Sequence, residues 1–129
     1  MPSPLLLTSF QKVLASLDEA LAQPKTIFMR DATIQRFEYT FEIAIKMMKR
    51  FLEQGHEGTS IDELSYRDLC RAAGEAGLLD NPARWWTYRE ARNSTSHAYE
   101  EGIAEDVYAT AGRFAVDARR LLGALMKRV

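Results

Sequence analysis

Hydrophobic residues recur at steps of three and four positions near the start of the chain, between about Pro4 and Gln23. The residues that share one helix face are Leu6, Phe10, Val13, Leu17 and Leu21. Polar residues such as Gln11 and Asp18 occupy the opposite face. This period predicts an amphipathic α-helix, which Pro24 ends because proline cannot continue a helix.

A second helix is predicted from a cap at Thr26 or Asp31 to Gln54, just before Gly55. Its apolar arc covers more than half of the circumference and comprises Ile34, Phe37, Tyr39, Phe41, Ile43, Ala44, Ile45, Met47, Met48 and Leu52. So wide an arc needs neighbours on two sides, either two helices of the same bundle or one such helix and a second subunit. The polar strip holds side chains at spacings suited to ion pairs within the helix, namely Glu38, Glu42, Lys46 and Lys49.

A short third helix is predicted after a polar loop. The segment from Ser65 to Asp68 resembles a capping box, and Gly74 or Gly77 closes the helix that follows it. Within this helix, we expect Cys70 to be a small core residue.

The fourth predicted helix begins with Asn81 and Pro82, a cap followed by proline at the first helical position. Its apolar face consists of Trp85, Trp86, Tyr88 and Ala91. We expect the two tryptophans to anchor the core or an interface rather than to stack on nucleobases. The helix should weaken between Asn93 and Ser96, because short polar side chains compete for backbone hydrogen bonds. The residues crowded at this helix end are Arg92, His97 and Tyr99.

The last helix is predicted to begin near Ala104, after a turn over Tyr99 to Gly102. An acidic start at Glu105 and Asp106 suits the helix dipole. The apolar stripe of this helix is Val107, Ala111, Phe114, Ala118, Leu121 and Leu125. The sequence therefore predicts an all-α fold, an antiparallel up-and-down four-helix bundle with one short extra helix, in which residues 1–129 form a single domain.

The composition limits the classes of function. A net charge of −1 argues against a protein that coats nucleic acid electrostatically, although a local site could still hold a phosphate chain. The single cysteine excludes an internal disulfide, and the absence of a signal peptide or long apolar run predicts a cytoplasmic protein without a membrane anchor. His56, in a predicted surface loop, and His97 have no histidine or cysteine at ligand spacing, which argues against a metal site.

The spacing of Arg92 and His97 allows two interpretations. In the first, Arg92 forms an ordinary ion pair with a carboxylate and His97 caps a helix end, where an imidazolium is favourable. In the second, the two residues form a site. They lie about 140° apart on an ideal helix, so they converge only if the helix frays or if a second copy completes the site. Arg36 falls within the apolar arc of the second helix, where its charge must pair across the bundle or line a site.

Two segments of the chain resemble a known family. The segment from Arg92 to Tyr99, RNSTSHAY, has the pattern Arg-x4-His-x-Tyr, which is the signature of the HEPN superfamily. The segment from Arg30 to Glu42, RDATIQRFEYTFE, resembles the second-helix block of one branch, the nucleotidyltransferase substrate-binding proteins, which include HepT-type toxins. With the chain length and the helical pattern, the resemblance covers nearly the whole chain.

The resemblance implies a two-fold homodimer in which the motifs of the two subunits face each other across a cleft. It also implies a separately encoded small nucleotidyltransferase as partner in a toxin–antitoxin-like system and, in some members, a metal-independent ribonuclease activity that needs no cofactor. Arg92 and His97 would then be the catalytic residues. The family blocks further indicate contacts to RNA or a nucleotide from Asn93, Arg36 and Glu38, and nucleotidylation of Tyr99 by the partner.

The residue types fit this chemistry, but two alternatives stay open. Histidine transfers protons near neutral pH, and the planar guanidinium of arginine binds phosphate. The first alternative is a non-catalytic subunit that presents a nucleotide or its own tyrosine to the nucleotidyltransferase, and the second is a purely structural helical dimer. The near-neutral net charge slightly favours these alternatives, whereas the match at the motif favours the ribonuclease.

Overall fold

The computed structural model describes residues 7–55 and 60–128, and within these ranges the chain forms five α-helices, two 3-10 turns and no β-strand. In chain order the elements are α1 (Thr8–Leu21), α2 (Ile27–Gly55), η1 (Ile61–Glu63), α3 (Tyr66–Glu75), α4 (Pro82–Ser94), η2 (Thr95–His97) and α5 (Glu101–Met126). The predicted all-α fold is confirmed, including the short helix between the second and fourth segments. Leu6 and His56 lie outside the described residues.

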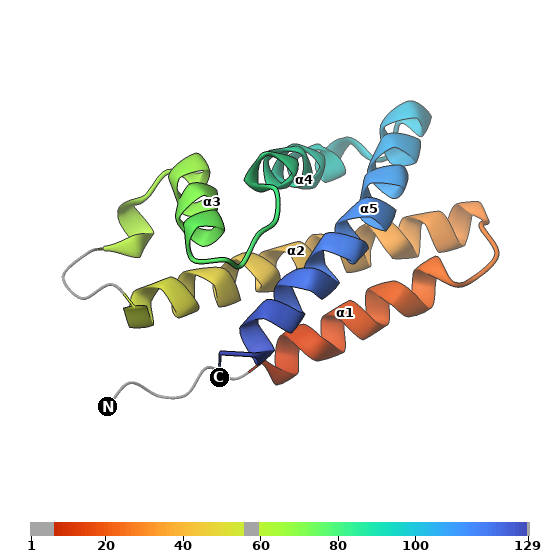
Figure 1. The fold of residues 1–129 in the computed structure, drawn as a ribbon. Helices are drawn as coiled ribbons and strands as arrows, with labels where there is room; N and C mark the ends of the chain where they lie inside the picture. The colour runs from red at the N-terminus through yellow and green to blue at the C-terminus, as the bar shows by residue number, and fades with distance from the viewer. Residues whose placement is uncertain (1–6, 56–59, 129) are drawn as a thin grey trace.

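The helices α1, α2 and α5 pack on one another, and α3 and α4 pack on α2 (Figure 1). Figure 1 shows α4 nearly along its own axis, so α4 is inclined to α2 and α5. It contacts both of these helices. α2 therefore has neighbours from its own chain on more than one side, and these neighbours account for its wide apolar arc. None of the described helices is long and apolar enough to cross a membrane.

The predicted caps hold the helix ends. In each, a side-chain oxygen accepts a hydrogen bond from a backbone N–H of the first turn, and the pairs are Thr26 with Met29 at 3.0 Å, Ser65 with Asp68 at 3.1 Å and Asn81 with Ala83 at 3.1 Å. At the other end of α3, the chain passes through Gly74 and turns at Gly77, whose φ is 81°. The backbone N–H of Leu78 then donates to the carbonyl of Ala73 at 2.9 Å, which is the bond that closes a Schellman-type helix end.

The start of α5 differs from the prediction. The helix begins at Glu101 rather than near Ala104, so Glu101 occupies the first turn. The reason is the buried guanidinium of Arg30 in α2, which donates to the carboxylates of Glu101 at 2.5 Å and Glu105 at 3.3 Å. This charged contact holds the first turn of α5 against α2, and it depends on residues about 70 positions apart, which helix periodicity cannot report.

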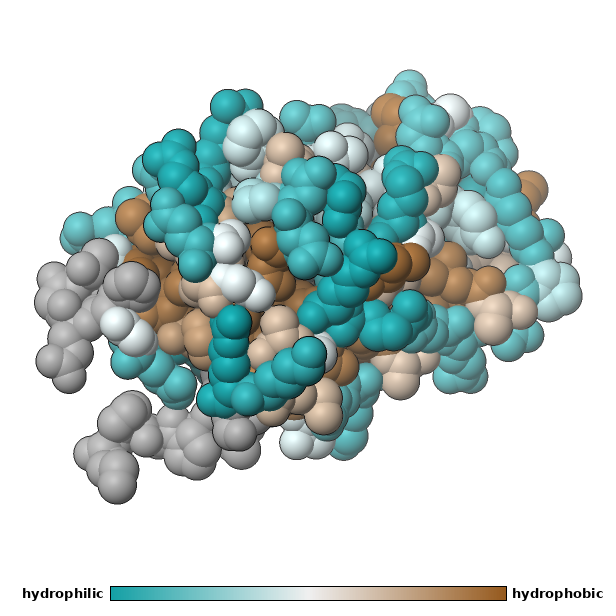
Figure 2. All heavy atoms as spheres, in the orientation of Figure 1, coloured by the Kyte–Doolittle hydropathy of each residue, from teal (hydrophilic) through white to brown (hydrophobic). Residues whose placement is uncertain are grey.

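Hydrophobic residues meet between the helices, while hydrophilic residues cover much of the face drawn in Figure 2. All six residues of the predicted α5 stripe are buried. Phe114, with no exposed surface, lies at the centre of an aromatic cluster. Its ring centroid is 5.2 Å from that of Phe37, 5.3 Å from Tyr88, 5.7 Å from Trp85 and 6.0 Å from Phe41. These contacts join α2, α4 and α5, and they confirm Trp85 as a core residue, as burial does for Cys70.

A buried carboxylate adds a polar contact between α4 and α5. Asp117, 6% exposed, accepts two hydrogen bonds from Arg84, at 2.8 and 3.0 Å, and another from the hydroxyl of Tyr88. Burial alone would raise the pKa of Asp117, but the hydrogen bonds from Arg84 and Tyr88 outweigh it and hold this pKa below its usual value. Burial and the same carboxylate raise the pKa of Tyr88.

We predict that Phe114→Ala lowers the free energy of unfolding by about 3–5 kcal/mol, because it removes a fully buried ring and leaves a cavity between three helices. Urea denaturation followed by circular dichroism measures this loss. Val116→Ala, at a half-exposed position of the same helix, is the matched control and should change stability little. Equal effects of the two substitutions would contradict the central role of Phe114.

We predict that Asp117 contributes stability that is lost in acid. Its folded-state pKa lies below the unfolded value, so the contribution is present above about pH 4 and disappears as the pH falls through the lower, folded-state pKa. Asp117→Asn should therefore be less stable than the wild type at pH 7, and the difference should shrink as the pH falls from about 5 to about 3. Urea denaturation across this range tests it, with the exposed Asp62→Asn as control. A difference that stays constant with pH argues against the ionised contact.

Candidate functional site

The end of α4 positions the candidate residues. The regular helix stops at Ser94, and a 3-10 turn carries the chain through His97. The hydroxyl of Ser94 donates to the carbonyl of Glu90 at 3.0 Å, and that of Thr95 donates to the carbonyl of Arg92 at 2.8 Å. The short polar side chains thus bind the carbonyls of the preceding turn, and the predicted weakening of the helix is confirmed.

Arg92 is fixed by two neighbours. Its Nε donates to Oε1 of Glu42 in α2 at 3.2 Å, its Nη2 donates to the same oxygen, and its Nη1 donates to the hydroxyl of Thr95 at 3.2 Å. These bonds use three of the five N–H donors of the guanidinium and leave two. The Arg92 side chain keeps 30% of its surface exposed, so a ligand can reach part of it. The ordinary ion pair considered for Arg92 therefore exists, and it also orients the side chain.

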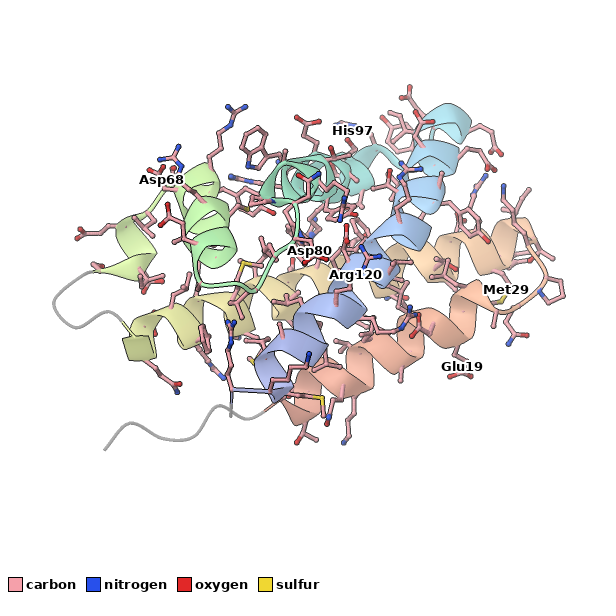
Figure 3. The ribbon with its side chains drawn as sticks, viewed as in Figure 1. Glu19, Met29, Asp68, Asp80, His97 and Arg120 are labelled. Carbon is pink, nitrogen blue, oxygen red and sulfur yellow. The ribbon has the colours of Figure 1, made fainter. Side chains whose placement is uncertain are left out.

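His97 and Tyr99 lie on the outer surface beyond α4. Figure 3 places His97 near the junction of α4 with α5, on the side of the fold opposite α1. The imidazole is exposed and makes no hydrogen bond to any residue within the described ranges. Its ring centroid is 6.3 Å from that of Tyr99, whose side chain is 82% exposed. Both groups are open to a ligand or a partner protein.

Glu38 lies close to this helix end, whereas Arg36 does not. A shallow hollow of about 280 Å³, which we call the Tyr99 hollow, is lined by Asp31, Ile34, Gln35, Glu38, Thr95, Ala98 and Tyr99. Positions 36 and 38 lie about 200° apart on a helix, so Arg36 points to another side of α2. Its Nη1 donates to the carbonyl of Ser16 in α1 at 2.8 Å. Arg36 thus takes the other predicted option, a contact across the bundle, and it is not brought together with the motif.

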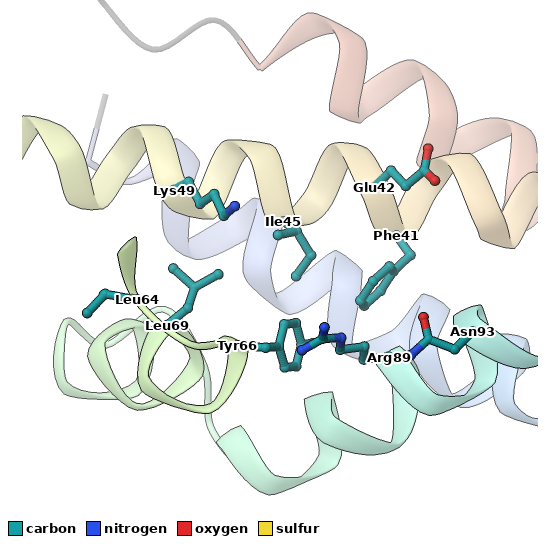
Figure 4. Close-up of a pocket in the computed structure, with 9 residues that line it drawn as sticks. All are labelled: Phe41, Glu42, Ile45, Lys49, Leu64, Tyr66, Leu69, Arg89 and Asn93. Carbon is teal, nitrogen blue, oxygen red and sulfur yellow. The ribbon is translucent and has the colours of Figure 1, made fainter. Parts of the chain in front are cut away.

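Asn93 lies in a second depression, between α2 and the pair α3 and α4. This cleft of about 360 Å³, which we call the α2–α4 cleft, is lined by Phe41, Glu42, Ile45, Lys49, Leu64, Tyr66, Leu69, Arg89 and Asn93 (Figure 4). Glu42 links the cleft to Arg92, because its carboxylate binds that guanidinium. The motif therefore contributes to both depressions, with Asn93 in the lining of the cleft and Thr95 and Tyr99 in the lining of the Tyr99 hollow.

Sequence reasoning gave no site role to Glu42 and Thr95, which lie within the two segments that resemble the family, or to Arg89 and Lys49, which line the α2–α4 cleft. One signal was available, since Arg89 and Asn93 are four residues apart and therefore share a helix face. Glu42 and Lys49 belong to the polar strip of α2, for which ion pairs within the helix were predicted. Instead, Glu42 pairs with Arg92 of α4, and Lys49 lies 3.9 Å from Asp62 of η1. Among the described residues, no group of three or more His, Cys, Asp or Glu side chains is placed to hold a metal ion.

The family of the chain follows from a comparison with known protein families. Residues 5–127 match the family described as nucleotidyltransferase substrate binding protein like. The chain belongs to this family. The predicted resemblance to the nucleotidyltransferase substrate-binding branch is thereby confirmed.

Individual relatives agree with this membership. A Haemophilus influenzae protein described as a probable ribonuclease HepT is 38% identical over 96 residues, which are 74% of this chain and 66% of that relative. A solved Haemophilus influenzae structure, described as having the fold of a substrate binding domain of a nucleotidyltransferase, matches with a TM-score of 0.87 at 30% identity over 94% of this chain and 99% of that one. A solved structure from Thermus thermophilus matches with a TM-score of 0.77 at 33% identity, covering 90% of this chain and 98% of its own.

We predict that Arg92→Ala and His97→Ala each change the free energy of unfolding by less than about 1 kcal/mol, because the Arg92–Glu42 pair is partly exposed and His97 is exposed. Urea denaturation tests this, with Phe114→Ala as a variant that must show a large loss. If either motif substitution lowers stability as much as Phe114→Ala does, the motif has a structural role.

Proposed function

We propose that this chain is a metal-independent endoribonuclease that pairs with a separately encoded small nucleotidyltransferase in a toxin–antitoxin-like system. The observation that carries the proposal is the placement of the motif. Arg92 keeps two free N–H donors, and the exposed His97 follows it on the next turn of the same helix end. The description of a relative as a probable ribonuclease supports the same activity.

In the proposed reaction, His97 accepts the proton of a ribose 2′-hydroxyl, and the 2′-oxygen attacks the adjacent phosphorus. The bond from phosphorus to the 5′-oxygen breaks, which leaves a 2′,3′-cyclic phosphate and a 5′-hydroxyl. Arg92 binds the phosphate and stabilises the extra negative charge of the transition state. Asn93, at the edge of the α2–α4 cleft, lies near enough to the motif to contact the RNA, whereas Glu38, in the Tyr99 hollow, offers a carboxylate that accepts hydrogen bonds from ribose or base donors and repels phosphate. Arg36 has no part in the proposal, since it binds Ser16.

The departing 5′-oxygen needs a proton, and a second histidine is required if imidazoles perform both transfers. The motif of one chain contains one histidine, His97. We therefore propose that a two-fold dimer brings the His97 residues of two subunits to one RNA strand. The exposed position of His97 leaves it accessible to a second copy. Tyr99, with its side chain 82% exposed, is the proposed target of nucleotidylation by the partner, which would block the adjacent motif.

The second candidate function is a non-catalytic subunit that binds the substrate of the nucleotidyltransferase. A specific observation favours it, because the structure that matches over 94% of the chain is described as having the fold of such a substrate binding domain. This function requires a stable complex with the nucleotidyltransferase but no turnover of RNA by the isolated chain. The two candidates therefore differ in a measurable activity.

We predict that the purified protein cleaves labelled cellular RNA in the presence of EDTA, and that Arg92→Ala or His97→Ala reduces the rate at least about 100-fold, the size expected for loss of a general base or an oxyanion donor. Gel electrophoresis of the products measures the rate. Arg71→Ala, an exposed arginine of α3, serves as a control that keeps the activity.

Mass spectrometry of Tyr99 must accompany this assay, because a modified protein would be silent. Cleavage by both motif variants would exclude the assigned roles of Arg92 and His97. Absence of cleavage by unmodified wild-type protein would favour the substrate-binding subunit, and co-purification with a small nucleotidyltransferase would then be the next measurement.

A further inference from the structure

The α2–α4 cleft combines an apolar floor with cations at its edge. The floor comes from aliphatic and aromatic side chains of α2 and α3, including Ile45, Leu69 and Tyr66. The Tyr66 ring is fixed, since its hydroxyl donates to the carbonyl of Trp85 at 2.7 Å. Burial raises the pKa of this hydroxyl, so it stays a neutral hydrogen-bond donor. Most of the cleft is lined by residues of α2, α3 and α4, and a hydrogen bond holds its aromatic side.

The cations of the cleft are available to an anion. Arg89 lies over the Tyr66 ring at 4.8 Å from the centroid, and within the described ranges it forms no ion pair with a carboxylate. Lys49 has only a long, exposed contact with Asp62 at 3.9 Å. The one carboxylate in the lining, Glu42, is neutralised by Arg92. Arg89 and Lys49 thus supply the net positive charge of the cleft, and the unused N–H donors of Arg92 add hydrogen-bonding capacity beside it.

The Tyr99 hollow has the opposite character. Its charged lining residues are Glu38 and Asp31, and Asp31 forms an ion pair with Arg30 at 3.1 Å; no lysine or arginine contributes to the lining that the structure describes. A phosphate chain that reaches Arg92 meets the carboxylate of Glu38 on this side and the cations Arg89 and Lys49 on the cleft side. Electrostatics therefore favours the cleft, rather than the hollow, as the place of the phosphate next to the one at Arg92.

We propose that the α2–α4 cleft binds one nucleoside phosphate unit next to the phosphate held by Arg92, with the base on the apolar floor and the phosphate at Arg89 and Lys49. A volume of about 360 Å³ is within the range of small-ligand sites and suits a single nucleotide. The unit is either a residue of an RNA strand or a free nucleotide. Asn93 supplies donor and acceptor groups at the end of the cleft nearest the motif.

Binding measurements test this assignment without relying on catalysis. The probe is a fluorescein-labelled RNA oligonucleotide with 2′-O-methyl groups throughout, which cannot be cleaved, and fluorescence anisotropy gives its affinity. Arg89→Gln and Lys49→Gln should each weaken binding about tenfold, because each removes a charged contact to phosphate. Each should also lower the slope of log K against log salt by about 0.7. Matched controls are Arg71→Gln and Lys46→Gln, which lie outside the cleft lining and should change the affinity less than about twofold.

Competition by nucleoside monophosphates and by inorganic phosphate distinguishes a site for a free nucleotide from a site for one residue of an RNA strand. Displacement of the oligonucleotide by monophosphates, lost in the Arg89→Gln variant, supports a site for free nucleotides. Weak competition by monophosphates, with the same loss of oligonucleotide affinity in the variant, supports a site for one residue of an RNA strand. Equal competition by inorganic phosphate would contradict a role for the apolar floor.

The cleft site rests on the proposed ribonuclease function, so the experiments must be able to reject either one without rejecting the other. Unchanged RNA affinity in both cleft variants, in a protein that cleaves RNA through His97, overturns the cleft site and leaves the ribonuclease standing. Lost affinity in the cleft variants, in a protein that cleaves no RNA, retains the nucleotide site and overturns the ribonuclease. Circular dichroism of each variant confirms that it is folded.

Discussion

The position of α4 depends on the aromatic cluster around Phe114. This ring of α5 contacts Trp85 and Tyr88 of α4 and Phe37 of α2, so one buried side chain fixes three helices relative to one another. The hydrogen bond from Tyr88 to Asp117 also restricts the orientation of α4 on α5, because a buried carboxylate accepts hydrogen bonds only from suitably placed donors. Once α4 is fixed in this way, its last turn must lie beside α2, and the guanidinium of Arg92 reaches Glu42.

Local patterns in the sequence were sufficient to predict most of the fold. The apolar stripe of α5 is buried in full, and the caps at Ser65 and Asn81 form as predicted, because each depends on residues within one or two turns. The end of α4 was also predictable, since short polar side chains act on the backbone beside them. The start of α5 was not, because Glu101 is held by Arg30 from a distant part of the chain.

The candidate site was predictable only in part. The motif pattern identified Arg92, His97 and Tyr99 by residue type, and it could not report their neighbours. Arg92 meets Glu42, which is 50 positions away, and this pair forms only after α2 and α4 have packed. The family block placed Arg36 and Glu38 together as candidates, but two residues at this spacing face different sides of a helix. Which of the two faced the motif could be learned only from the tertiary structure.

The net charge of the chain is a poor guide to its ligand. A value of −1 describes the field far from the protein, whereas salt screens charges beyond about 8 Å under physiological conditions. Within that distance the surroundings of the motif are uneven, with Lys49 and Arg89 in the lining of the cleft and Glu38 in the lining of the hollow. The proposed nucleotide site in the cleft depends on this short-range difference and not on the net charge of the chain. The near-neutral composition argued only against a protein that coats nucleic acid, and a local site of this kind is compatible with it.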